Sequence, residues 1–347
     1  MENIVTTTTT LRLPSTVLSA PTAHRVLTGD RPTGSLHIGH YFGSLQNRVR
    51  LQNQGIDMFV LIADYQAITD RDTTGNIGET VREVVLDYLA VGLRPDETTI
   101  FAHSAVPALN QLMLPFLSLV SMSELSRNPT VKEEIDSSGR AGVSGLMLTY
   151  PVHQAADILF CDANLVPVGE DQLPHLELTR TIARRFNERY APLFTPPEAL
   201  LSTTPRLLGT DGTMKMSKSR GNAIPLAANS DETAALIRSA TTDSNRRIEY
   251  DPQNRPAVSN LVMLAALCGG TTPEAVAEQV GDGGAAALKR LVTENVNEYF
   301  APIRQRRREF AADPSIVGRI LAEGNARAEE IADRRLAEVR RAMGTSY

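Results

Sequence analysis

A strand that ends in a glycine-containing turn and opens into a helix constrains the fold of this chain more than any other feature. Apolar residues of His24–Leu27 indicate the strand, and Pro32 and Gly34 then interrupt regular structure. Apolar Phe42, Leu45 and Val49 follow at spacings of three and four, which is the period of a helix. The sequence therefore places a helix N-terminus directly beyond the end of a strand.

A helix start of this kind favours an anionic ligand. Free backbone N–H groups and the positive end of the helix dipole point at the turn, so a phosphate fits there. Gly39 has no Cβ and lets a ligand approach the backbone closely, while His37 and His40 add hydrogen-bond donors. The turn is thus predicted to be half of a nucleotide site.

Composition excludes several classes of protein. No apolar run reaches the roughly 18 residues of a membrane-spanning helix. The two cysteines, Cys161 and Cys268, are far apart and outside any cysteine or histidine cluster. This pattern signals neither a disulfide framework nor a structural zinc site, and it suits a reducing cytoplasm.

Charge is distributed unevenly along the chain. The net charge of −5 argues against uniform attraction to nucleic acid. Arginines nevertheless cluster at Arg304 with Arg306–Arg308, and again between residues 334 and 341. These clusters are predicted to be either local phosphate contacts or solvated helix faces balanced by nearby glutamates.

The order of apolar segments predicts three parts. Residues 1–22 are rich in threonine and lack amphipathic periodicity, so they are expected to be a disordered tail; they match neither a signal peptide nor a transit peptide. From residue 23, strands expected at Met58–Ala63 and Thr98–Ala102 alternate with a helix at Ile77–Val91, which indicates α/β class with a parallel sheet.

After residue 230 only helical patterns follow. They run from Thr233 to Leu264, from Pro273 to Val292, and from Val296 to the end. We therefore expect a Rossmann-like catalytic domain over residues 23–225 and an all-helical domain over residues 226–347.

A second phosphate-binding segment is predicted at 211–222. This polar, glycine-flanked stretch indicates a mobile loop. Lys215 and Lys218 place two ammonium groups close together, which favours an anionic partner such as a triphosphate. The hydroxyls of Ser217 and Ser219 add donors.

The two segments together resemble the signatures of the class I aminoacyl-tRNA synthetases. His37-Ile38-Gly39-His40 matches the first signature and Lys215-Met216-Ser217-Lys218-Ser219 matches the second. In that family the two loops hold one ATP. Further matches in Tyr150–Asp157, Val166–Gln172 and His175–Arg180 resemble the tryptophanyl group of the family, and not the tyrosyl group, over roughly residues 25 to 345.

The resemblance implies the site residues by position. Four residues would stabilise the reacting phosphates: His37, His40, Lys215 and Lys218. The ATP-binding set would be Arg31, Pro32, Thr33, Gly39, His40, Gly169, Glu170, Asp171, Leu207, Lys215, Met216, Ser217, Lys218 and Ser219. The tryptophan-binding set would be Asp157, Tyr150, Gln172, Gln66 and Gln154.

Physical reasoning from the residues supports the part given to Asp157. Its neighbours Ala155, Ala156 and Ile158–Phe160 are apolar, so an unpaired carboxylate there is costly and a bound indole N–H would relieve it. A site that must pair a buried acceptor rejects amino acids without the donor, so no editing domain is needed.

Three features depart from the family pattern, two single residues and one adjacent pair. Gln66 stands where many relatives carry histidine, and Gln154 where many carry methionine, so the contacts around the indole are open. Asp30 and Arg31 stand where others have a neutral pair, which would bring a cation near the reacting groups.

The implied activity is a tryptophan–tRNA ligase that forms tryptophanyl-adenylate and then charges tRNA(Trp). ATP would be the substrate with Mg²⁺, without a protein-bound metal. Partners would be tRNA(Trp), L-tryptophan and a second copy of the chain, with no DNA and no membrane, in the cytoplasm. Two alternatives stay open: a tyrosyl enzyme, or a regulatory paralogue that binds tryptophan or tRNA without charging it.

Overall fold

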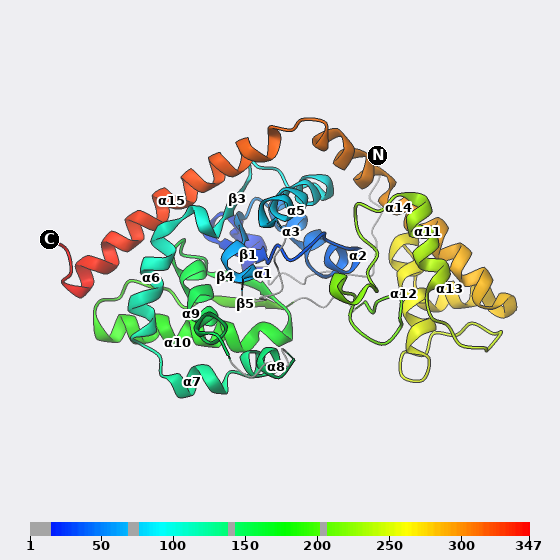
Figure 1. Ribbon diagram of the computed structural model, residues 1–347, viewed down its shortest axis with the longest axis horizontal. Helices are drawn as coiled ribbons and strands as arrows, with labels where there is room; N and C mark the ends of the chain where they lie inside the picture. The colour runs from blue at the N-terminus through cyan, green and yellow to red at the C-terminus, as the bar shows by residue number, and fades with distance from the viewer. Residues whose placement is uncertain (1–14, 69–75, 138–142, 202–206) are drawn as a thin grey trace.

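The computed structural model describes residues 15–68, 76–137, 143–201 and 207–347. Within them one parallel sheet has the strand order β3-β2-β1-β4-β5 (Figure 1). The strands are β1 (Arg25–Asp30), β2 (Asp57–Ile62), β3 (Thr98–Ala102), β4 (Leu165–Val168) and β5 (Glu198–Leu201). This confirms the predicted α/β class and parallel sheet.

The strand order determines where a ligand can bind. Strands β2 and β3 follow β1 on one side, whereas β4 and β5 lie on its other side. The order in which strands are added therefore changes direction between β1 and β4, which pair in parallel. In open parallel sheets, ligands bind beyond the carboxyl ends of the strands at such a switch point. The glycine-containing turn after β1 and the acidic segment after β4 therefore open toward the same crevice.

Both faces of the sheet are buried, as alternation along β2 shows. Met58, Val60 and Ile62 belong to one hydrophobic cluster, and Phe59 and Leu61 to the other. Buried side chains of α3 (Gln46–Asn53) and α5 (Ile77–Val91) join the first cluster. Those of α6 (Pro107–Leu117), α9 (Gly145–Leu159) and α10 (Leu173–Arg189) join the second.

Shorter elements connect these units. They are α1 (Ser15–Ser19), η1 (Pro21–Ala23), α2 (Ile38–His40), the π-helical turn η2 (Tyr41–Leu45), α4 (Asp64–Ala67), η3 (His103–Ala105), α7 (Met122–Arg127), α8 (Pro129–Ser137), η4 (Glu170–Gln172), η5 (Lys218–Arg220) and η6 (Gly281–Gly283).

Sequence patterns missed three features. Strand β5 is an edge strand whose residues are mostly accessible, so it lacks a buried apolar run. The predicted tail is wrong for residues 15–22, because α1 forms there and Val17 is buried; residues 1–14 lie outside the described ranges. The helix expected over Thr233–Leu264 is two helices, α11 (Ser230–Ser239) and α12 (Pro256–Gly269), separated by a non-helical segment.

Three more helices complete the C-terminal part: α13 (Pro273–Val280), α14 (Gly284–Ala311) and α15 (Ile316–Met343). Helices α11 to α14 group on one side of the molecule in Figure 1, where α14 packs on both α12 and α5. Helix α14 is continuous where the sequence pattern suggested a break between Val292 and Val296. The domain boundary near residue 226 stays a prediction.

Helix α15 returns along the parallel sheet. It packs on β3 and α6, and a Cβ on Gly324 would lie 1.9 Å from the carbonyl oxygen of Ile100, so only glycine permits this approach. The Asn325 side chain accepts a hydrogen bond from the N–H of Ala102 at 2.9 Å. An edge strand otherwise leaves this N–H unpaired, and α15 therefore covers the edge of the sheet.

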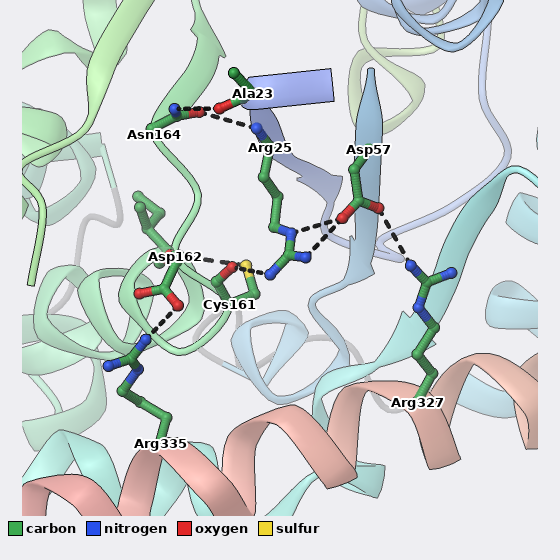
Figure 2. Close-up of polar contacts among 9 residues, drawn as sticks. Ala23, Arg25, Asp57, Cys161, Asp162, Asn164, Arg327 and Arg335 are labelled. Atoms are coloured by element: carbon green, nitrogen blue, oxygen red, sulfur yellow. Dashed lines mark hydrogen bonds and ion pairs between the residues drawn. The ribbon is translucent and has the colours of Figure 1, made fainter. Parts of the chain in front are cut away.

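Ion pairs hold α15 at the amino ends of the strands (Figure 2). Asp57 on β2 accepts from Arg25 at 2.7 Å and from Arg327 of α15 at 3.3 Å. Asp162 pairs with Arg335 farther along α15. These contacts lie at the amino ends of the strands, whereas the crevice lies beyond their carboxyl ends. They therefore attach α15 to the sheet and are not part of the crevice.

Three arginines of the cluster on α14 face inward, so neither predicted alternative holds for them, while Arg308 is exposed. Arg304 is buried and donates to Thr233 and Asn297. Arg306 donates to the carbonyl of Ala90, and Arg307 pairs with Asp87. Only packing could reveal this, because the sequence spacing is equally typical of a solvated face.

Among the described residues no helix is both long and apolar enough to span a bilayer.

Candidate active site

The turn after β1 is held by reciprocal capping between its two histidines. His37 is the N-cap of α2, and its Nδ1 accepts from the N–H of His40 at 3.3 Å. The N–H of His37 in turn donates to Nδ1 of His40 at 3.2 Å, and the rings lie 3.7 Å apart. Because each Nδ1 accepts, each ring carries its proton on Nε2 and can donate it to a ligand.

Both histidines are neutral near pH 7. Burial, with a contribution from the neighbouring His40, lowers the pKa of His37 to about 3. Burial also lowers the pKa of His40, and the charge of Lys215 lowers both pKa values further. They can therefore stabilise a phosphate by hydrogen bonding, without carrying a charge of their own.

Asp30, at the end of β1, is the anchor of this turn. It accepts from Arg48 and from the hydroxyl of Tyr88, each at 2.6 Å. Burial alone would raise its pKa, but the adjacent Arg48 outweighs burial and holds the pKa at about 2. The sequence departure at Asp30 is thus accounted for by an internal ion pair.

The lysine loop is closed by a residue that the sequence analysis did not select. Asn222 is buried and donates to Asp211 at 2.6 Å. Its side-chain oxygen accepts from the N–H of Ser217 at 2.8 Å, and its backbone oxygen accepts from Thr210 at 2.9 Å. One asparagine therefore ties both ends of the loop together around the two lysines.

The two predicted phosphate segments meet in space. A Cβ on Gly34 would lie 2.3 Å from the side chain of Lys218, and a Cβ on Gly39 would lie 3.4 Å from that of Met216. His37 and Lys218 line one cavity of about 210 Å³, whose other walls are Ser35, Gly221, Ala223 and Pro225. The backbone of Ile38 bonds to that of Ile224 at 3.1 Å. Two segments far apart in sequence thus enclose one space.

The other predicted ATP residues lie on three separate segments, after β1, after β4 and before the lysine loop. Arg31 and Thr33 are exposed on the turn and Pro32 is buried, while Leu207 is buried and its carbonyl accepts from the N–H of Met216. Glu170 and Asp171 are exposed after β4, and a Cβ on Gly169 would lie 2.6 Å from Asp171. The side chain of Ser219 lies outside the described set.

Asp157 lies in a buried cluster of polar side chains. It is fully buried on α9 and accepts from the Gln66 side chain at 3.3 Å. Its other oxygen lies 3.2 Å from Nδ1 of His103, which follows β3 directly. The His103 ring stacks 3.7 Å from His153, and His153 contacts Asn110 at 3.0 Å. A chain of buried polar groups thus leads to the Asp157 carboxyl.

Burial favours the neutral form of each titratable side chain in this cluster. It raises the pKa of Asp157 well above its usual range, with the charge of Asp64 adding to the effect. It lowers the pKa of His103 and brings that of His153 to about 4. Oδ1 of Asp157 accepts no hydrogen bond from the described residues, although His103 is near. An N–H donor from a ligand would satisfy that oxygen.

The remaining predicted tryptophan residues occupy a second part of the crevice. The Tyr150 hydroxyl pairs with Nε2 of His175 at 3.1 Å. Burial lowers the pKa of His175 to about 4, and the charge of Arg31 adds to the effect. Gln172 donates to Asp171 at 3.4 Å, and half-buried Gln154 lies one helical turn before Asp157.

His103 and His153 had sequence signals that the analysis passed over. His103 directly follows a parallel strand at its carboxyl end, where functional residues collect, and His153 lies four residues before Asp157 on the same helix face.

Within the described ranges no three histidine, cysteine, aspartate or glutamate side chains gather as a metal site.

Comparison with known proteins agrees with this geometry. The family profile "tRNA synthetases class I (W and Y)" matches residues 20–301. A tryptophan–tRNA ligase from Clostridium longisporum is 45% identical over 93% of this chain and 97% of its own length. The enzyme of the same name from Streptococcus pyogenes serotype M1 is 43% identical over 93% of this chain and 98% of its own length.

Solved structures show the same relationship. The Campylobacter jejuni tryptophanyl-tRNA synthetase, crystallised with ADP and tryptophan, superposes with a TM-score of 0.79 at 31% identity, covering 92% of this chain and 99% of that chain. A tyrosyl-tRNA synthetase from Aeropyrum pernix has a TM-score of 0.66 at 22% identity, covering 89% and 90% of the two chains, and shares the fold.

Proposed function

The chain belongs to the tryptophan–tRNA ligases, a family of class I aminoacyl-tRNA synthetases, and from this membership we propose that it activates L-tryptophan with ATP and charges tRNA(Trp). The proposal assigns the phosphates to the cavity between His37 and Lys218, and the indole to the pocket of Asp157. Tyr150, Gln172, Gln66 and Gln154 complete the amino-acid side of the proposed site.

The observation that carries the choice of tryptophan is the buried carboxyl of Asp157. Its Oδ2 accepts from Gln66, but its Oδ1 accepts no hydrogen bond from the described residues, so a ligand that brings an N–H is favoured. The indole N–H of tryptophan supplies that donor in an otherwise apolar ring, whereas phenylalanine has none. A tyrosyl enzyme shares the fold, and the phenolic O–H of tyrosine is also a donor, so the choice between these two amino acids rests on the tryptophan–tRNA ligase relatives.

The first step needs no protein nucleophile. A carboxylate oxygen of tryptophan attacks the α-phosphorus of ATP in line, the bond from that phosphorus to the bridging oxygen breaks, and pyrophosphate leaves with the electron pair. ATP enters as its magnesium complex, so the metal arrives with the substrate. The protein contributes position and donors: Nε2–H of His37 and His40 at the α- and β-phosphates, and Lys215 and Lys218 at the leaving pyrophosphate.

In the second step a terminal ribose hydroxyl of the tRNA attacks the adenylate carbonyl, and AMP leaves. We assign anticodon contact to the helical part after residue 226, whose helices α11 to α14 group on one side of the molecule (Figure 1). Arg304 and Arg307 are engaged internally, so they are removed from the proposed tRNA surface. Arg308, which is exposed on α14, stays in it.

The proposal includes a homodimer in the cytoplasm, where tRNA is charged. Exposed Leu114 on α6 and Met122 on α7 support an interface between copies, since their side chains are 69% and 66% accessible. Large apolar side chains exposed on neighbouring helices mark interaction surfaces in soluble proteins.

ATP–pyrophosphate exchange with purified protein tests the proposal. Tryptophan should drive exchange and be preferred over phenylalanine by a factor of roughly 10⁴, because a site built around a buried acceptor rejects a ligand without a donor. Tyrosine carries a phenolic O–H donor, so its rejection depends on the shape of its ring, and it is the competitor that tests the choice of amino acid. Charging of tRNA(Trp) should follow in the same preparation. Exchange driven by tyrosine would favour the tyrosyl activity, and binding of tryptophan or tRNA without exchange would favour the regulatory paralogue.

A further inference from the structure

Asp87 is a buried carboxylate outside the cavity that contacts two distant parts of the chain. It lies on α5 and is fully buried. Its Oδ1 accepts from Nε of Arg307 on α14 at 2.7 Å, and its Oδ2 accepts from the backbone N–H of Leu36 at 3.2 Å. One carboxylate therefore joins a C-terminal helix to the residue before His37.

The Arg307–Asp87 contact is a partly buried ion pair. The Arg307 side chain is only 14% accessible, and its Nη2 also pairs with Glu83 at 2.5 Å. Burial raises the pKa of Asp87 to about 6 although Arg307 opposes the increase. Removing the arginine would leave a buried carboxylate without its cation, which is strongly unfavourable, so Asp87 would protonate or turn away from its present position.

Leu36 is the point at which that change would reach the site. Its carbonyl accepts from the N–H of Leu226 at 2.9 Å, and the next residues bond to Ile224 and cap α2. The N–H of Leu36 faces the opposite way, to Asp87. The position of the His37 turn is therefore set on one side by the chain after the lysine loop and on the other by Asp87.

We propose that Arg307 and Asp87 are positioning residues for the phosphate side of the site, and that they make the position of the His37 turn depend on the position of α14. The inference rests on the proposed function for the reaction that these residues affect. The path of contacts runs from Arg307 to Asp87, to the N–H of Leu36 and then to His37. Because α14 belongs to the region assigned to tRNA contact, a shift of α14 reaches the residue before His37 through Asp87, in addition to the contacts of Tyr299 and Phe300 with Tyr41 after His40.

Variants of the full-length protein in ATP–pyrophosphate exchange test this inference. Arg307→Met should raise the KM for ATP roughly tenfold, lower kcat, and leave the KM for tryptophan within about twofold, because only the phosphate side loses its support. The double variant Asp87→Asn/Arg307→Met should recover much of the ATP affinity. The amide oxygen introduced at position 87 can accept from the N–H of Leu36 without leaving a buried charge.

Arg306→Met is the matched control. Arg306 is the adjacent residue of α14 and donates to Ala90 of the same helix α5 at 2.8 Å, so its loss weakens the same helix contact without touching Leu36. It should lower the melting temperature while both KM values stay within about twofold of wild type. Equal changes in the two KM values for Arg307→Met, or the same effect from Arg306→Met, would overturn the proposal.

Calorimetric titration with ATP alone separates this inference from the proposed function. Weaker ATP binding by Arg307→Met than by Arg306→Met supports the positioning role even if the wild type fails to exchange with tryptophan, which would contradict the proposed function only. Unchanged ATP binding overturns the positioning role. If Arg307→Met does not fold, Arg307→Lys is used in its place. The lysine keeps the cation but cannot reach Asp87 and Glu83 together, so ATP binding should weaken in the same direction by a smaller factor.

Discussion

The two halves of the site differ in how they use charge. The phosphate half is open: Lys215 and Lys218 are exposed, and donors come from a histidine turn and a loop closed by Asn222. The amino-acid half is closed: Asp157 and His103 are fully buried, and burial opposes the charge of each.

This difference separates two tasks. Exposed cations can follow a triphosphate whose charge moves during the reaction, and they interact most with the departing pyrophosphate, so they should control turnover. A buried acceptor has a fixed cost that only a matching donor relieves, so it should control which amino acid binds. The predictions below compare these two tasks, from the largest expected effect to the smallest.

Lys218→Ala should lower kcat for exchange roughly a hundredfold with little change in the KM for tryptophan. Lys218 lies against Gly34 and lines the cavity with His37, so its ammonium group is placed for the pyrophosphate. Exchange kinetics measure both constants. Arg220→Ala is the control, because Arg220 is an exposed cation of the same short helix. Equal losses in the two variants would show that only the net charge of the loop matters.

His103→Leu should raise the KM for tryptophan roughly tenfold and leave kcat within a few-fold, because Asp157 would then face an apolar side chain. Steady-state exchange at varied tryptophan checks this. His24→Leu, at the amino end of the sheet beside Asn164, should change neither constant. A fall in kcat without a change in KM would contradict the division between the two halves.

Asn222→Ala should lower kcat roughly fivefold, because the lysine loop loses the side chain that joins Asp211 to Ser217. The KM for tryptophan should not change. Asn254→Ala removes a comparable exposed bond to Asp251 and serves as the control in the same assay. Loss of tryptophan affinity in Asn222→Ala would mean that the halves are not independent.

Acid should weaken the fold without a matching loss of tryptophan selectivity. The folded-state pKa values of His37, His153 and His175 lie near 3 to 4, below the usual 6.5, so unfolding takes up protons as the pH falls. Stability is fully present above about pH 6.5 and is lost progressively toward pH 4, at about 1 kcal/mol per histidine per pH unit. Asp87, whose pKa is raised to about 6, partly offsets the loss.

Denaturant unfolding near pH 7 and near pH 5 measures this change in the free energy of unfolding. His175→Gln should make the pH dependence shallower by removing one titrating group while its hydrogen-bonding capacity is kept. A free energy of unfolding that stays constant or rises on acidification would contradict the assignment of neutral buried histidines.

Local patterns predicted the framework of the molecule well. The strands Met58–Ala63 and Thr98–Ala102 and the helix Ile77–Val91 are apolar runs with a clear period, and they are found within a residue or two of the expected bounds. The meeting of the His37 turn with Lys218 was predictable because both segments carry signatures that act on one ligand.

Features that depend on packing were not predictable. His103 and His153 reach Asp157 only through the crossing of β3 and α9, and Asn222 matters only because the loop folds back on Asp211. The inward direction of Arg304 and Arg307 depends on which faces of α14 meet α11 and α5. A one-dimensional pattern contains the period of a helix but not the partner of each face.

Exchange kinetics of Asp157→Ala and Lys215→Ala, measured side by side, test the separation of tasks most directly. The account predicts opposite effects: Asp157→Ala raises the KM for tryptophan roughly a hundredfold and relaxes selectivity while kcat changes little. Lys215→Ala lowers kcat roughly a hundredfold while the KM for tryptophan changes little. If both variants lose kcat and tryptophan affinity in the same proportion, the two halves act as one unit and the account is wrong.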